Sequence, residues 1–219
     1  LSSPEGNRNS VSEHVVGLLL NYFHHISKSF DEIKNFEWNV EQNRVEELTG
    51  KKVGIIGYGN TGSATAEKLN AFGSKVFAYD KFVKGFGNER VKECSVEEIF
   101  AHAEIVSMHI PFNHQTHYFC DRPFFKSFSN EIIFINTSRG KICNTRDLLD
   151  AVNSGKIKFA MLDVLENEQF EKFSTEEKKI FDELMATKKI FITPHIAGKS
   201  FQSRKLFSEI LLAKLEAFL

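Results

Sequence analysis

The chain has 219 residues, of which 42% are hydrophobic and 26% charged, and its formal net charge is −1. These values are ordinary for a globular protein with a sizeable core, and they exclude the strongly basic surface of a nucleic-acid-binding protein or a polybasic membrane anchor. The longest apolar run, VVGLLL at 15–20, is far shorter than the roughly 20 residues that a bilayer span needs.

The first predicted element is a helix. Ser10 and Glu13 have the spacing of a capping box, and the apolar residues that follow fall on one helical face. We expect this helix to continue, with a break, to about Trp38, and a loop to run from there to Gly50. The apolar face consists of Val15, Leu18, Leu19, Tyr22 and Phe23.

From Lys52 onward, short apolar runs alternate with amphipathic stretches. This alternation predicts parallel βαβ units and hence an α/β fold with a Rossmann-type doubly wound parallel sheet. The segment 95–100 has a capping box of its own. We expect strands at 52–56, 75–79, 104–110, 132–136, 159–164 and 190–193, and helices at 61–72, 95–100, 145–155, about 170–187 and 200–219.

A glycine-rich turn, GIIGYGNTG at 54–62, joins the first strand to the next helix. In that context G-x-G-x-x-G indicates a dinucleotide site. Gly57 would permit the tight turn, Gly59 would let a pyrophosphate approach the backbone, and Gly62 would let helix and strand pack closely. The first amides of the helix would then face the phosphates.

An acidic residue follows the second strand at the position that this motif requires. Asp80 lies 18 residues after Gly62, and its carboxylate could accept hydrogen bonds from the adenosine ribose. The acid favours NAD over NADP, although the nearby Lys81 and Lys84 weaken that preference. The alternative is a glycine-rich turn with an incidental surface aspartate.

Three unusual polar residues follow later strands, where ligands of open α/β sheets bind. Arg139 stands in NTSRG, Glu168 in LENE and His195 in TPHIAG. A histidine can exchange a hydroxyl proton, a carboxylate can orient it, and an arginine can hold a substrate carboxylate. Each residue also has a structural explanation when taken alone, but together they suit redox chemistry at a hydroxy acid.

The cysteines are three in number and show no CxxC spacing: Cys94, Cys120 and Cys143. Their odd count predicts a reducing, cytoplasmic location and no metal site. The small-molecule partner would be a 2-hydroxy or 2-oxo acid, with no nucleic acid and no membrane partner.

The chain contains a series of motifs in the order SVSEHVVGLLL, GKKVGIIGYGNTG, FAYD, SMHIPFNHQT, FINTSRGKI, DLLDAVNSGKI, MLDVLENE and ITPHIAG. By these motifs, nearly the whole chain resembles the D-isomer-specific 2-hydroxyacid dehydrogenases. Within that family, SSPEGNRNSVSEH and YDKFVKGFGN look most like phosphoglycerate-dehydrogenase-type members, which implies 3-phosphoglycerate as substrate and a place in serine biosynthesis.

The resemblance implies a role for each matching position. His195 would be the general acid/base, Glu168 its carboxylate partner and Arg139 the residue that binds the substrate. Asp163 would contact the nicotinamide carboxamide. Cofactor binding would involve Gly57, Gly59, Asn60, Thr61, Gly62, Asp80, His109, Pro111, Thr116, Thr137, Ser138 and Gly198, together with Arg139, Asp163 and His195. One departure is Gln169, which replaces a proline that often follows the glutamate.

The resemblance also implies a domain organisation. Residues 1–199 would form the NAD-binding domain, with a leading helix in a homodimer interface, and 200–219 would return to a substrate domain. The family carries that domain upstream, and the chain begins at Leu1 without a signal peptide. We therefore expect a fragment or processed product that binds NADH but turns over poorly. The alternatives are a lactate-type or other 2-hydroxyacid dehydrogenase, or a non-catalytic NAD-sensing scaffold.

Overall fold

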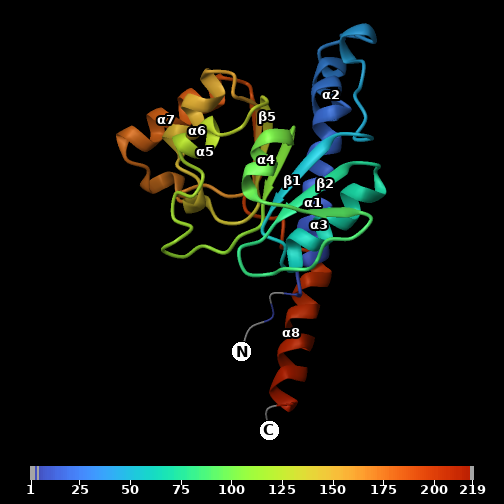
Figure 1. Ribbon diagram of the computed structural model, residues 1–219. Helices are drawn as coiled ribbons and strands as arrows, with labels where there is room; N and C mark the ends of the chain where they lie inside the picture. The colour runs from blue at the N-terminus through green and yellow to red at the C-terminus, as the bar shows by residue number, and fades with distance from the viewer. Residues whose placement is uncertain (1–2, 4, 218–219) are drawn as a thin grey trace.

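The computed structural model describes residue 3 and residues 5–217, and these form an α/β body from which two helical segments project (Figure 1). The body contains one seven-stranded sheet in the order β3-β2-β1-β4-β5-β6-β7, and every neighbouring pair is parallel. The predicted Rossmann-type sheet is therefore confirmed. The strands are β1 (Lys52–Ile56), β2 (Lys75–Tyr79), β3 (Val91–Glu93), β4 (Ile105–Met108), β5 (Ile132–Asn136), β6 (Ile157–Leu162) and β7 (Ile190–Ile192).

The central strands are buried on both faces, as strands of a parallel sheet must be. All five residues of β5 and all four of β4 are buried, which explains their almost continuous runs of apolar residues. The edge strand β3 was not predicted, because VKE holds only one buried apolar residue, Val91.

Helices cover the sheet on both sides. On one side α1 and α3 contribute Val15, Leu19 and Leu69 to one apolar cluster; on the other, α4, α5 and α6 contribute to a second. The five-residue α5 was not predicted, because it is shorter than two helical turns. The helices are α1 (Arg8–Phe23), α2 (Ile26–Lys34), α3 (Asn60–Ala71), α4 (Val96–His102), α5 (Arg122–Lys126), α6 (Thr145–Asn153), α7 (Thr175–Ala186) and α8 (Phe201–Glu216).

The capping box predicted at Ser10 and Glu13 is wrong. Helix α1 begins at Arg8 after Asn7, so Ser10 lies inside the helix and cannot cap it. Its hydroxyl instead donates to the carbonyl of Ala197, at 2.6 Å. The Ser10 hydroxyl is thus engaged in a tertiary contact, which the local sequence does not show.

Two later helix starts show what a serine cap does in this chain. Ser95 caps α4 by accepting from the backbone N–H of Glu98, but the Glu98 side chain pairs with Lys92, so only half of the predicted box forms. A complete capping box instead begins α7, where Ser174 and Glu177 bond each other's backbone.

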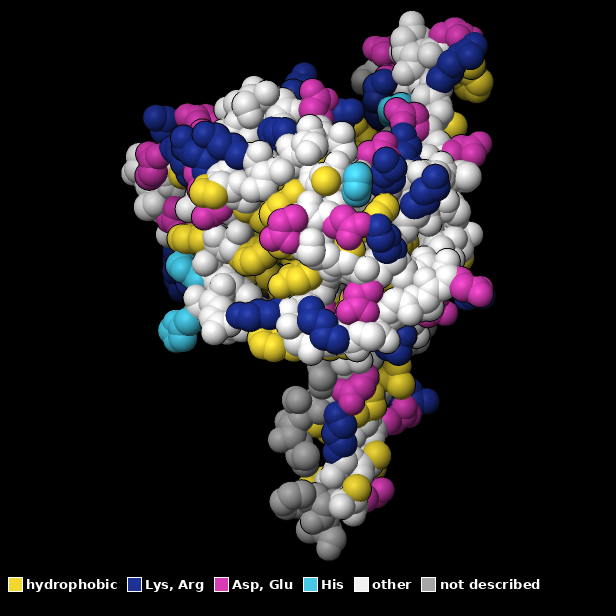
Figure 2. Space-filling view, in the orientation of Figure 1, with side chains coloured by type: hydrophobic (Ala, Val, Ile, Leu, Met, Phe, Trp, Pro, Cys, Tyr) yellow, Lys and Arg dark blue, Asp and Glu magenta, His cyan; other side chains and the backbone are white. Residues whose placement is uncertain are grey.

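Helices α2 and α8 project from opposite ends of the body (Figure 1), and hydrophobic side chains lie open on both (Figure 2). Within the described residues no helix is long and apolar enough to cross a membrane. The cytoplasmic location and the division at residues 199 and 200 stay predictions, and residues 1, 2, 4, 218 and 219 lie outside the described part of the chain.

Candidate functional site

The sheet order places β1 beside β4 although the two are not consecutive in the chain, so the direction of winding reverses between them. Open α/β sheets bind ligands at such a switch point, beyond the carboxyl ends of the strands. The glycine turn follows β1 there, and His109 follows β4.

The three glycines of the turn meet different surroundings. Gly57 has φ +97°, and a Cβ there would collide with the carbonyl oxygen of His109. A Cβ on Gly62 would collide with the carbonyl oxygen of Gly57, because helix α3 lies so close to the turn. Around the Cβ position of Gly59, by contrast, no described atom lies within 4 Å. Gly57 and Gly62 thus serve packing within the protein, whereas Gly59 keeps open space clear.

That open space belongs to a cavity of about 670 Å³ at the switch point. The turn after β1, the end of β4 and the loop after β5 all contribute to its wall. The predicted cofactor residues that line it are Gly59, Asn60, Thr61, His109, Pro111, Thr137, Ser138 and Arg139.

Two features of the cavity fit a bound dinucleotide. Gly59 stands at the N-cap of α3, and no side chain caps that helix, so its first amides are available to an anion. The hydroxyl oxygen of Thr137 is buried without a hydrogen-bond partner among the described residues. A buried polar atom of this kind normally has a partner, which a ligand in the cavity would supply.

His109 is buried in the wall of this cavity. Its Nε2 lies 2.9 Å from the hydroxyl of Ser107, and its Nδ1 lies 3.2 Å from that of Thr61. Burial lowers the pKa of His109 to about 4, so the imidazole is neutral near pH 7. It therefore links β4 to the start of α3 without placing a charge beside the cofactor.

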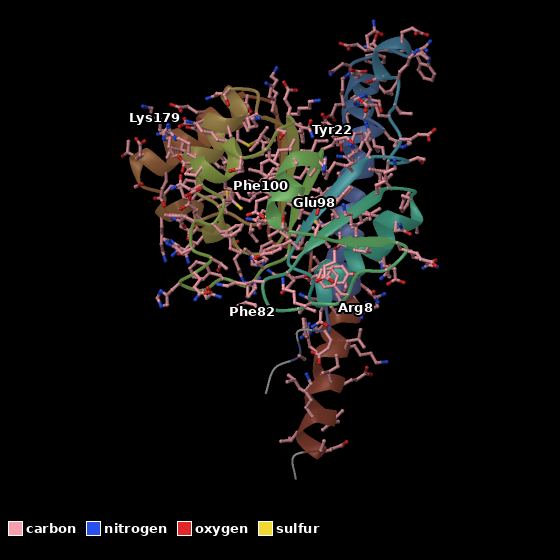
Figure 3. All side chains as sticks on the ribbon, in the orientation of Figure 1. Arg8, Tyr22, Phe82, Glu98, Phe100 and Lys179 are labelled. Carbon is pink, nitrogen blue, oxygen red and sulfur yellow. The ribbon has the colours of Figure 1, made fainter. Side chains whose placement is uncertain are left out.

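Asp80 lies at the end of β2, but much of its carboxylate is already engaged. It accepts the backbone N–H of Tyr58 at 2.7 Å, Phe82 at 2.7 Å and Val83 at 2.9 Å. Burial raises the pKa of Asp80, but these N–H groups outweigh that effect and hold it below its usual value. The charged carboxylate thus fixes the loop that carries the exposed Phe82, at the lower edge of the body (Figure 3). The contact of Asp80 with the ribose stays a prediction.

Thr116 supports the loop after β4. Its hydroxyl donates to the carbonyl of Pro111 at 2.7 Å and accepts the backbone N–H of Asn113 at 2.8 Å. Thr116 is absent from the cavity lining, so in this structure it shapes the loop that carries Pro111.

His195 and Glu168 come together. The Nδ1 atom of His195 lies 3.0 Å from Oε1 and 2.9 Å from Oε2 of Glu168, which joins the segments after β6 and β7. Both side chains are partly exposed and line a cavity of about 410 Å³. His195 has φ +54°, a left-handed conformation that residues other than glycine adopt rarely.

Asp163 holds the histidine segment. Its buried carboxylate accepts the backbone N–H of Ile196 and of Ala197, both at 2.9 Å, and the hydroxyl of Thr193 at 2.6 Å. Its backbone carbonyl accepts the N–H of His195 at 2.8 Å. The side chain predicted to contact the nicotinamide is thus built into the loop that presents His195.

Arg139 and Gly198 do not line the cavity of the His195–Glu168 pair. Arg139 lines the larger cavity with the glycine turn, and its Nη1 donates to the carbonyl of Ser138 at 2.6 Å. Ser138 in turn donates to the carbonyl of Met108 at 2.7 Å. Gly198 packs against Asn7, whose Nδ2 would lie 2.7 Å from a Cβ there.

Sequence reasoning missed several residues of the site. Thr193 contacts Asp163, and His14 contacts Thr193 with an Nε2-to-Oγ1 distance of 3.0 Å. No sequence motif distinguished His14, which shares its helical face with the polar residues Asn7 and Ser10. Over the described part of the chain, no three His, Cys, Asp or Glu side chains gather as a metal site requires.

Comparison with known proteins gives this geometry a family. The family model described as "D-isomer specific 2-hydroxyacid dehydrogenase, NAD binding domain" matches residues 16–197. A hydroxypyruvate reductase of Blautia hydrogenotrophica is 32% identical over 96% of this chain and 65% of its own length. A D-3-phosphoglycerate dehydrogenase of Bacillus subtilis is 29% identical over 93% of this chain and 38% of its own.

Among solved structures, the D-lactate dehydrogenase of Aquifex aeolicus, complexed with NAD and lactic acid, superposes with a TM-score of 0.88 at 28% identity. That match covers 99% of this chain and 68% of the other. The chain spans less than two thirds of the Blautia and Bacillus relatives. It belongs to the D-isomer specific 2-hydroxyacid dehydrogenase family, and residues 16–197 are an NAD-binding domain of that family.

Proposed function

We propose that the protein is an NAD-dependent dehydrogenase that interconverts a D-2-hydroxy acid and its 2-oxo acid. The observation that carries this proposal is the contact between His195 Nδ1 and the Glu168 carboxylate, at 2.9 and 3.0 Å. A carboxylate on one ring nitrogen fixes the tautomer and the orientation of an imidazole, and this is what a general acid/base needs.

In this proposal each residue has a separate task. When bound, NADH would give a hydride to C2 of the 2-oxo acid in reduction, and NAD⁺ would accept the hydride from C2 of the hydroxy acid in oxidation. Because Glu168 engages Nδ1, Nε2 of His195 is the nitrogen that takes the hydroxyl proton in oxidation and returns it in reduction. Among the described residues, the Arg139 side chain makes one hydrogen bond, from Nη1 to the carbonyl of Ser138. Its other N–H donors can form a fork to the substrate carboxylate.

The cofactor would occupy the cavity beside Gly59. The uncapped amides of α3 would receive the pyrophosphate, and the unpartnered hydroxyl of Thr137 would bond a polar group of the cofactor. Asp80 is charged and would repel a 2′-phosphate, which favours NAD over NADP.

The substrate would be a small 2-oxo acid. The resemblance suggests 3-phosphoglycerate, whose 2-oxo form is phosphohydroxypyruvate, and a place in serine biosynthesis. Relatives of similar identity, however, are named hydroxypyruvate reductase and D-3-phosphoglycerate dehydrogenase. The test measures NADH oxidation by the complete gene product with hydroxypyruvate, pyruvate and phosphohydroxypyruvate. The highest kcat/KM assigns the substrate.

His195→Asn tests the assignment of the acid/base. Asparagine tolerates the left-handed backbone of this position, so the loop keeps its shape. We expect kcat to fall about 10²–10⁴-fold while NADH affinity is retained. Stopped-flow turnover and fluorescence titration with NADH check both parts. A wild-type protein that binds NADH but reduces none of the three acids would instead support the scaffold alternative.

We also propose that the protein is a homodimer joined through α2. Helix α1, expected at the interface, buries its apolar face within the chain, against α3. The segment after it leaves large apolar side chains exposed, and a patch of this kind marks an interaction surface. These side chains, the α2 patch, are Ile26, Phe30, Ile33, Phe36, Trp38, Val40 and Val45.

A further inference from the structure

One face of α1 lies against the segment 193–198 that carries His195. Asn7 contacts Gly198, the Ser10 hydroxyl donates to the carbonyl of Ala197, and His14 contacts Thr193. Residues 7, 10 and 14 are three and four positions apart, which is the spacing of one helical face. Figure 3 shows Arg8, the first residue of α1, close to the point where α8 leaves the body. The first helix is thus docked against both ends of the histidine segment.

The contact of His14 has a defined direction. The Thr193 hydroxyl has one hydrogen, and it donates that hydrogen to Oδ1 of Asp163 at 2.6 Å. Thr193 Oγ1 must then accept from His14, so Nε2 of His14 carries a hydrogen. Burial lowers the pKa of His14 and the charge of Asp163 raises it, with burial the larger effect. A neutral imidazole with its hydrogen on Nε2 can donate this bond, and it places no positive charge beside Asp163.

The chain of bonds ends on the backbone around the catalytic histidine. Asp163 accepts the N–H groups of Ile196 and Ala197 through its side chain, and that of His195 through its carbonyl. These bonds surround the one residue of the segment that holds a left-handed φ, +54°. Such a conformation persists only where neighbouring contacts enforce it.

We propose that His14 and Thr193 are positioning residues for His195, acting through hydrogen bonds that fix the Asp163 carboxylate beneath the histidine segment. The proposal rests on the proposed function for the role of His195. Neither residue touches the reacting atoms. Their effect is to keep the imidazole aimed at the substrate once Glu168 has set its tautomer.

The experiment compares two kinds of variant of the complete gene product. One kind keeps the shape of the side chain but removes its hydrogen-bonding group, and the other keeps that group. Thr193→Val removes the hydroxyl and Thr193→Ser keeps it; His14→Phe removes the donor, and His14→Gln keeps an N–H at the position of Nε2. We expect T193V and H14F to lower kcat roughly 10- to 100-fold with NADH affinity changed less than about twofold, since small misplacement of a catalytic group is costly. T193S and H14Q should recover most of kcat.

Glu13→Gln is the matched control, because Glu13 is exposed on the same turn of α1. It should leave kcat unchanged. A purely structural role predicts lower melting temperatures with unaltered kcat, or equal losses for T193S and T193V; either result overturns the proposal.

A second measurement separates this proposal from the proposed function. If the wild-type protein reduces no 2-oxo acid, the proposed function fails, and ¹⁵N NMR of the chain then decides the positioning role. We expect the Nε2–H tautomer at His14, and backbone amide shifts at 195–197 that move in T193V but not in T193S. Unmoved amides in T193V, or an Nδ1–H tautomer at His14, would refute the positioning role.

Discussion

Gly59 and Gly62 stand three residues apart and do different work. The missing side chain of Gly62 makes room for the protein's own backbone, whereas that of Gly59 leaves a space that no described atom uses. The sequence motif suggests both roles, but only the coordinates separate a glycine kept for packing from one kept for a ligand.

Replacing each glycine by alanine should therefore affect different properties: mainly stability at Gly62, and mainly NADH affinity at Gly59. We expect Gly62→Ala to destabilise the fold by about 1–3 kcal/mol, because its Cβ would overlap a carbonyl oxygen. Gly59→Ala should cost less, about 0.5–1 kcal/mol, because alanine is a poorer N-cap than glycine but its Cβ meets no described atom, while NADH affinity falls. Urea unfolding and NADH titration check the pair. Equal stability losses in both variants would contradict the distinction.

His109 predicts a pH dependence of stability. Its folded pKa of about 4 lies below the usual value near 6.5, so the unfolded chain binds the proton first as pH falls. Stability is full above pH 6.5 and is lost as pH falls from there toward 4, by about 2 kcal/mol between pH 7 and pH 5.

The measurement is urea unfolding of wild type and of His109→Gln at pH 7 and pH 5. The glutamine does not titrate, so the variant should lose about 2 kcal/mol less than wild type over this interval. Parallel losses in the two proteins would show that His109 does not titrate as described.

At the scale of elements, helix starts show where local sequence is sufficient. Ser174 and Glu177 form the reciprocal box that their spacing allows, and Glu177 keeps its bond to the Ser174 backbone although its Oε1 also accepts from Asn167. Ser10 and Glu13 have the same spacing but no box, because α1 begins earlier and Ser10 bonds Ala197. The two motifs differ at the serine: Ser174 caps its helix, whereas the Ser10 hydroxyl is bonded to a distant carbonyl.

Ser174→Ala should lower the unfolding free energy by about 1 kcal/mol, because α7 loses the acceptor for one of its first amides. Ser208→Ala, at an exposed position inside α8, is the control and should change it by less than about 0.5 kcal/mol. Thermal and urea unfolding test both variants. A loss at Ser208 as large as that at Ser174 would argue against the cap.

At the scale of the molecule, helices cover both faces of the sheet in the body, whereas the two projecting helical segments leave apolar side chains exposed. The α2 patch and the exposed apolar residues of α8 lie at opposite ends of the molecule (Figure 2).

Replacing Phe30 in the α2 patch by glutamate should convert a dimer to monomers in sedimentation velocity. Phe201→Glu on α8 is the matched control and should leave the dimer intact. A monomeric wild-type protein would refute the dimer.

The sequence by itself determined the alternation of strands and helices, the glycine turn, and the polar residues at strand ends. These depend on periodicity and on the steric needs of single residues, which local sequence records. It did not reveal β3, which holds a single buried apolar residue, or α5, which is shorter than two helical turns.

Only the tertiary structure decided what the polar side chains contact. It joined His195 to Glu168 across 27 positions, placed Arg139 with the glycine turn, and built Asp163 into the histidine segment. It also brought His14 to Thr193 across 179 positions. Such contacts depend on the order of strands in the sheet, because a side chain's partners come from whichever segments the strand order places beside it.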